Sequence, residues 1–111
     1  MQTPTMLARV FAALGDPTRV ELVTRLATGD ASVTQLAEPL PMTQQAVSRH
    51  LRVLEDAGLV SRGRQAQARP AHLEVERLEE VLAWVGDRRR EWLDRHERLA
   101  GHLAEIQEEQ R

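Results

Sequence analysis

Residues 43–60 read TQQAVSRHLRVLEDAGLV, and this stretch predicts an amphipathic helix that ends at Gly58. At about 100° per residue, its apolar residues fall on one side of the helix: Val47, Leu51 and Leu54. Polar residues form a face on the other side: Gln45, Ser48, Arg49 and Arg52, with Gln44 at its margin. Such a face is often simply solvated, but amides and guanidinium groups also suit base edges and phosphates. The helix is therefore a candidate for DNA recognition.

A short helix is predicted immediately before this one. Ser32 and Gln35 form a capping box that opens it, and Pro39 limits it to about two turns. Thr43 is then placed as the N-cap of the following helix. Two helices joined by a tight turn, the first of them very short, predict a helix-turn-helix.

Two further helices are predicted nearer the N-terminus. Residues 6–14 carry apolar side chains at helical spacing, and Gly15 ends that segment. Asp16 is a suitable N-cap for the next helix, and Pro17 occupies the first helical position, where a missing N–H has no cost. We expect this second helix to stop at Gly29.

The segment at about 59–75 has a different pattern. Gly63 and Pro70 interrupt it, and its apolar residues come in short groups, which predicts a two-stranded wing with a tip near residues 64–69. From Glu76 onward the pattern is helical again. The predicted fold is mainly α with a small β-hairpin, a winged helix-turn-helix.

Length and composition limit the functional classes. The 111 residues fit one domain, with a DNA-binding core at 6–75 and a C-terminal dimerisation helix or helices at 76–111. The absence of cysteine excludes disulfides and thiolate metal sites. Without a membrane-length apolar run or a secretion signal, we expect a soluble cytoplasmic protein. The net charge is -2, but residues 43–73 hold five arginines and only two acids.

Several stretches resemble the ArsR (arsenical-resistance repressor) family of winged helix-turn-helix regulators, in a cysteine-free form. The matching segments occur in the family's order and spacing: LGDPTR at 14–19, SVTQLA at 32–37, AVSRHL at 46–51 and LEDAGLV at 54–60. Together they cover roughly residues 6–75. The resemblance implies a homodimeric repressor that binds a palindromic operator and releases it when an effector binds.

The resemblance also implies which residues contact double-stranded DNA: Thr43, Gln44, Gln45, Ser48, Arg49, Arg52, Arg62, Arg64 and Arg69. For the wing arginines, simple solvation is an open alternative. His50 lies near the apolar side of its helix, so we expect it to pack between helices. Arg19 is either structural or close to DNA.

The last third of the chain carries a seam of residues at steps of three or four, which predicts a partner helix. Members of the seam predicted to form a homodimer interface are Leu82, Val85, Trp92, His96, Leu99, Leu103 and Ile106. The resemblance implies that the first predicted helix also contributes, so that the dimer forms via the terminal helices. The alternative is that this helix packs only against its own domain. Gly86 leaves open whether the helix is continuous.

A metal site and an enzyme are both poorly supported. Some members of the family bind metal through Asp-x-His and His-x-x-Glu, and Asp94, His96, His102 and Glu105 repeat those fragments. The two histidines, however, are separated by a rotation of about 240°, so no metal or cofactor is predicted. Trp84 and Trp92 suit either a helix interface or a pocket for an effector, whose identity the sequence does not give.

No catalytic motif is present, because the HExxH pattern, a glycine-rich phosphate loop and a nucleophile signature are all missing. The alternative to a DNA-binding regulator is a winged-helix adaptor for protein–protein contact. An adaptor does not require the arginines of the recognition helix and wing, so they favour DNA binding.

Overall fold

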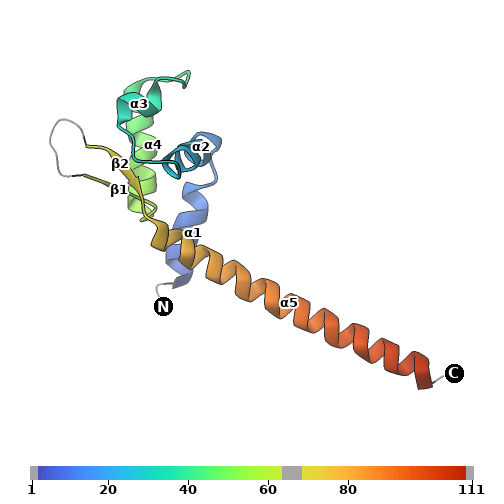
Figure 1. The fold of residues 1–111 in the computed structure, drawn as a ribbon. Coiled ribbons are helices and arrows are strands. Elements are labelled where there is room, and N and C mark those ends of the chain that lie inside the picture. The colour runs from blue at the N-terminus through green and yellow to red at the C-terminus, as the bar shows by residue number, and fades with distance from the viewer. Residues whose placement is uncertain (1–2, 64–68, 110–111) are drawn as a thin grey trace. The chain divides into compact units, whose positions relative to one another are not determined.

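The computed structural model describes residues 3–63 and 69–109 and confirms the predicted winged helix-turn-helix. Its elements in chain order are α1 (Thr3–Ala13), α2 (Pro17–Leu26), α3 (Val33–Ala37), α4 (Gln44–Asp56), β1 (Val60–Arg62), β2 (Ala71–Leu73) and α5 (Val75–Glu109) (Figure 1). They belong to two compact units, Met1–Leu78 and Glu79–Arg111. The first unit contains the helix-turn-helix and the wing.

The predicted N-cap of α2 is confirmed by its hydrogen bonds. The Asp16 carboxylate accepts from the backbone N–H of Thr18 at 2.8 Å and of Arg19 at 3.2 Å. Partial desolvation raises the pKa of Asp16, but these two backbone donors outweigh it and hold the pKa below its usual value. Pro17 takes the first helical position, as predicted.

Local sequence signals also fix the ends of α3 and α4. Both bonds of the capping box form: the Ser32 hydroxyl accepts from Gln35 N at 3.2 Å, and the Gln35 side chain accepts from Ser32 N at 2.9 Å. Thr43 caps α4 by accepting from Ala46 N at 3.1 Å. Gly58 follows α4 with φ +77°, a left-handed conformation that favours glycine and ends the helix.

The core of the first unit is almost entirely aliphatic. Its largest fully buried side chains come from four helices and the start of the wing: Val10, Leu22, Leu36, Val47, Leu51, Leu54 and Leu59. No polar or charged residue is buried in the described part of the chain. The apolar side of α4 predicted from periodicity is thus the side that packs into the core.

The wing is a two-stranded antiparallel sheet in which Val60 pairs with Leu73 and Arg62 with Ala71. Ala71 also exchanges hydrogen bonds with Ala31, which ties the loop between α2 and α3 to β2. The predicted hairpin is confirmed. Arg64, at the predicted tip, lies outside the described residues.

The second unit consists of most of α5. This helix is continuous through Gly86, because a single glycine costs a helix only about 1 kcal/mol and does not break it. No residue of α5 is buried. None of the helices in residues 3–63 and 69–109 is both long and apolar enough to span a membrane.

Candidate nucleic-acid interface

The two sides of α4 differ sharply in exposure. Val47, Leu51 and Leu54 have no exposed surface, whereas the polar residues predicted to contact DNA are all exposed. These exposed residues are Thr43, Gln44, Gln45, Ser48, Arg49 and Arg52. Burial of the apolar side fixes the rotation of the helix, so the polar face is held outward by the core.

The polar face of α4 continues into the wing. Ser48 and Arg52 of α4 line an open groove of about 550 Å³ together with Arg62 and Arg69 of the wing. Glu55 and Asp56 also line it. The predicted wing arginines and the predicted helix residues are therefore brought to one surface, where three guanidinium groups border the same groove.

Contacts within the wing orient its arginines. Arg62 Nε donates to the carbonyl of Arg69 at 3.2 Å, and Arg69 Nε donates to the carbonyl of Gly63 at 3.1 Å. Arg62 also lies 3.8 Å from a Glu55 carboxylate oxygen, which offsets part of its charge. Arg69 is exposed and forms no ion pair with a described residue. Arg69 is consequently the better placed of the two for a phosphate.

His50 and Arg19 hold the helices together. His50 is half-buried, and its Nδ1 lies 3.2 Å from Arg19 Nη1. Because a guanidinium can only donate, Nδ1 accepts, and the ring proton resides on Nε2. Arg19 Nε also donates to the carbonyl of Ala13 at 2.6 Å. Arg19 thus connects the end of α1 with α4, which gives it a structural role.

Arg25 is an important residue that the sequence analysis missed. It is half-buried on α2, and its guanidinium donates to the carbonyls of Leu36 at 2.6 Å and Gln35 at 2.9 Å. These carbonyls lie in α3, so Arg25 fixes α2 to α3, the first helix of the helix-turn-helix. No spacing rule indicates this contact, because it joins residues in different helices.

The predicted dimer residues lie on α5 with large apolar surfaces exposed. Leu82 is 70% exposed and Trp92 58%, and the rings of Trp92 and His96 stack with centroids 3.5 Å apart. His96 Nδ1 donates to the Trp92 carbonyl at 2.8 Å. The homodimer interface stays a prediction. Within the described residues, no group of three or more His, Asp or Glu side chains could hold a metal ion.

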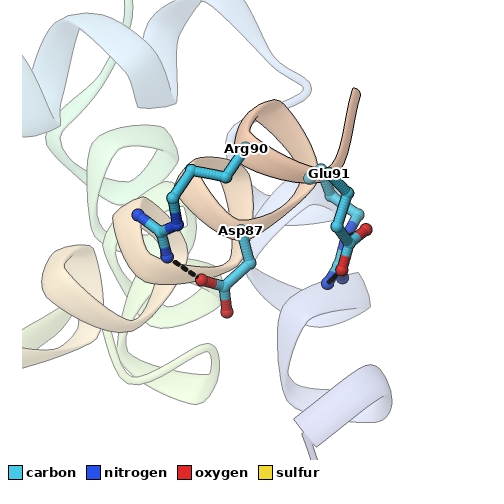
Figure 2. Close-up of polar contacts among 4 residues, drawn as sticks. Asp87, Arg90 and Glu91 are labelled. Carbon is cyan, nitrogen blue, oxygen red and sulfur yellow. Dashed lines mark hydrogen bonds and ion pairs between the residues drawn. The ribbon is translucent and has the colours of Figure 1, made fainter. Parts of the chain in front are cut away.

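Charged residues of α5 just beyond Gly86 pair with one another. Asp87 binds Arg90, as Figure 2 shows, and Arg88 Nη2 lies 2.8 Å from a Glu91 oxygen. The hydrogen bond from Arg88 lowers the pKa of Glu91. These pairs lie within one helix and offset part of the charge of Arg88 and Arg90.

Comparison with known proteins points to one family. A family model described as "Bacterial regulatory protein, arsR family" matches residues 16–62, from the N-cap of α2 to the end of β1. The transcriptional repressor SdpR of Bacillus subtilis is 30% identical over 76 residues, which cover 68% of this chain and 84% of SdpR. Two curated regulators of Mycobacterium tuberculosis match a shorter stretch, and the chain spans about half of their length (49% of each).

Solved structures give the same result over more of the chain. An ArsR-like transcriptional regulator from Rhodococcus sp. RHA1 superposes with a TM-score of 0.76 and 34% identity, covering 86% of this chain and 90% of that one. A Mycobacterium bovis domain, Mb0332, is described as a homodimeric winged helix-turn-helix DNA-binding domain. Its TM-score is 0.63 with 27% identity, over 80% of this chain and 82% of Mb0332.

Proposed function

Because the chain belongs to the ArsR family of bacterial regulatory proteins, we propose that it is a transcriptional repressor that binds a palindromic DNA operator as a homodimer. α4 enters the major groove, and the wing lies against the phosphate backbone. An effector then releases the DNA. The proposal is supported by the surface of the first unit and by the descriptions of the similar proteins.

The observation that carries the proposal is the outward polar face of α4. Gln45 and Arg49 are exposed near the N-terminal half of the helix, which is the part that reaches base edges in helix-turn-helix proteins. Arg49 suits the acceptor pair of guanine, and Gln45 suits adenine. Ser48 and Arg52, one turn further along, are placed for the flanking phosphates.

The wing supplies contacts that position the protein without reading sequence. Arg62 and Arg69 border the groove beside α4, and a phosphate there would meet cations from both elements. The charge of the stretch agrees, because residues 43–73 hold five arginines and two acids in a chain of net charge -2. DNA binding should therefore weaken steeply as salt rises.

Dimerisation accounts for the exposed seam of α5. Two α4 helices in a symmetric dimer would read half-sites about one helical turn, or a multiple of it, apart. The M. bovis domain, described as homodimeric, supports this arrangement. The predicted interface residues are Leu82, Val85, Trp92, His96, Leu99, Leu103 and Ile106.

Fluorescence anisotropy tests the function directly. The purified chain is titrated into labelled DNA from upstream of its own gene and into unrelated DNA, each at several salt concentrations. Preferential binding with a log affinity that falls as log salt rises supports the proposal. If the upstream DNA binds no better than unrelated DNA, selection from random DNA follows. Failure to enrich any sequence would contradict the proposal and favour the protein–protein adaptor.

A further inference from the structure

A second pocket lies on the first unit and shares Asp56 with the groove beside the polar face of α4. It has a volume of about 360 Å³ and opens between α1, the start of α2 and the C-terminal half of α4. Its apolar lining comes from Ala12 and Ala13 of α1 and from Val53 and Ala57 at the end of α4. Small ligands are typically bound in pockets of about 300–1,000 Å³ with mainly apolar walls.

Charged side chains at this pocket favour an anion. Arg9 of α1 and Arg19 of α2 both line it, and neither forms an ion pair with a carboxylate in residues 3–63 and 69–109. Asp56 is the one acidic residue of the lining, so positive charge is in excess. Guanidinium groups above an apolar floor match a ligand with an apolar body and a planar carboxylate.

Arg19 still has donors to offer such a ligand. Its Nε and Nη1 contact the Ala13 carbonyl and His50 Nδ1, and its other N–H groups have no partner in the described part of the chain. A ligand bound there would shift the guanidinium group that also contacts His50, which belongs to α4. Val53, Asp56 and Ala57 connect the same pocket to the end of that helix.

We propose that the pocket lined by Arg9, Arg19, Val53 and Ala57 binds a small aromatic or aliphatic carboxylate, and that binding alters the position of α4 through the Arg19–His50 contact. The carboxylate pairs with Arg9 and Arg19, and its apolar part covers the alanines and Val53. Binding at the pocket stands independently of the proposed function. The consequence for DNA affinity rests on that function.

The test for binding uses the full, ¹⁵N-labelled chain without DNA and sodium 2-naphthoate as the probe. Saturable shifts of the Ala12 and Ala57 amide signals are expected, with much weaker binding of the uncharged 2-naphthamide. Arg9→Gln should lower the naphthoate affinity about tenfold, because it removes one charged hydrogen-bond partner. Arg95→Gln on α5 is the matched control and should leave the affinity unchanged, since Arg95 lies outside the pocket.

A second variant tests the pocket itself. Ala12 is exposed on α1, so Ala12→Phe should fill the space without disturbing the core and should abolish binding. Shifts confined to the exposed leucines of α5, or equal affinities of Arg9→Gln and Arg95→Gln, would overturn the site. The site would also be overturned if naphthoate does not bind and Arg9→Gln changes the self-association of the chain. In that case a second copy of the chain would cover this surface.

The coupling is tested with the same probe in the DNA anisotropy assay. Naphthoate should weaken operator binding, and operator DNA should lower naphthoate affinity by the same factor, because linkage is reciprocal. Arg9→Gln should reduce both effects, whereas Arg95→Gln should not. Naphthoate binding that leaves operator affinity unchanged would overturn the coupling through Arg19. Absence of DNA binding altogether would instead contradict the proposed function, while the NMR result still decides the site.

Discussion

His72 of β2 and Asp30 of the loop after α2 form an ion pair, with the histidine Nδ1 2.7 Å from a carboxylate oxygen. The hydrogen bond to Asp30, followed by the charge of that carboxylate, raises the pKa of His72 above its usual 6.5. The pair lies beside the Ala31–Ala71 bridge. It therefore helps to join the wing to the helix-turn-helix, and its strength depends on pH.

We expect the contribution of His72 to stability to be larger in mild acid than in alkali. Because the pKa of His72 is higher in the folded chain than in the unfolded chain, the stabilisation is complete at pH values below the unfolded-state pKa. It is lost as the pH rises through the folded-state pKa. The difference in Tm between the wild-type chain and His72→Gln should therefore be greater at about pH 6 than at about pH 9. Circular dichroism melting measures it.

His102→Gln is the control for this pH effect. His102 is an exposed histidine of α5. Its substitution should change Tm little and with no comparable trend. A wild-type advantage over His72→Gln that stays constant or grows toward high pH would contradict the assignment of the pair.

Arg25→Ala should destabilise the first unit by about 1–3 kcal/mol, because hydrogen bonds from a charged group to two carbonyls are lost. Arg25→Lys should recover only part of the loss, since an ammonium cannot reproduce the forked contact with Gln35 and Leu36. Urea unfolding gives the free energies. Arg98→Ala, at an exposed position of α5, serves as the control and should have little effect. If Arg25→Ala and Arg98→Ala have the same free energy of unfolding, the contact between Arg25 and α3 does not stabilise the first unit.

Local signals were sufficient to predict the elements of the first unit. Asp16, Ser32 and Thr43 each cap a helix through neighbours two or three residues away, so their contacts can be predicted from spacing alone. The exposed face of α4 can likewise be predicted, because the apolar residues at helical spacing are the ones that are buried. Gly86 left the course of α5 open, and the helix continues through it because one glycine is a small penalty in a long helix.

Contacts between distant residues could not be predicted in this way. Arg19 and His50 are 31 residues apart, and no period or cap relates them. The sequence alone does not decide whether Arg19 is structural or close to DNA. Its partners, the Ala13 carbonyl and His50, follow only from the packing of α1, α2 and α4. The pocket lined by Arg9 and Val53 has the same origin, because it exists only where α1, α2 and α4 meet.

Arg49→Ala and Arg69→Ala should affect DNA binding in different ways. Arg49→Ala is expected to weaken operator binding by about 1–3 kcal/mol and unrelated DNA much less, because a base contact is lost. Arg69→Ala should weaken binding to both DNAs by a similar factor. It should also reduce the slope of log affinity against log salt by about one, as expected for the loss of a phosphate contact. Anisotropy titrations at several salt concentrations measure both. Equal losses of Arg49→Ala on the two DNAs would make Arg49 a phosphate contact.

The exposed seam of α5 should be the main determinant of dimerisation. Leu99 is 54% exposed, so a charge there costs an isolated chain little, but it would be buried without a partner in an interface. Leu99→Glu should therefore give monomers in sedimentation velocity. The helical circular dichroism signal of the chain should be retained, which shows that the variant is folded. Glu97→Arg, an exposed charge change off the seam, should leave the dimer intact. If Leu99→Glu remains dimeric at the same dissociation constant, the interface lies elsewhere, and the half-site spacing expected from α5 pairing falls with it.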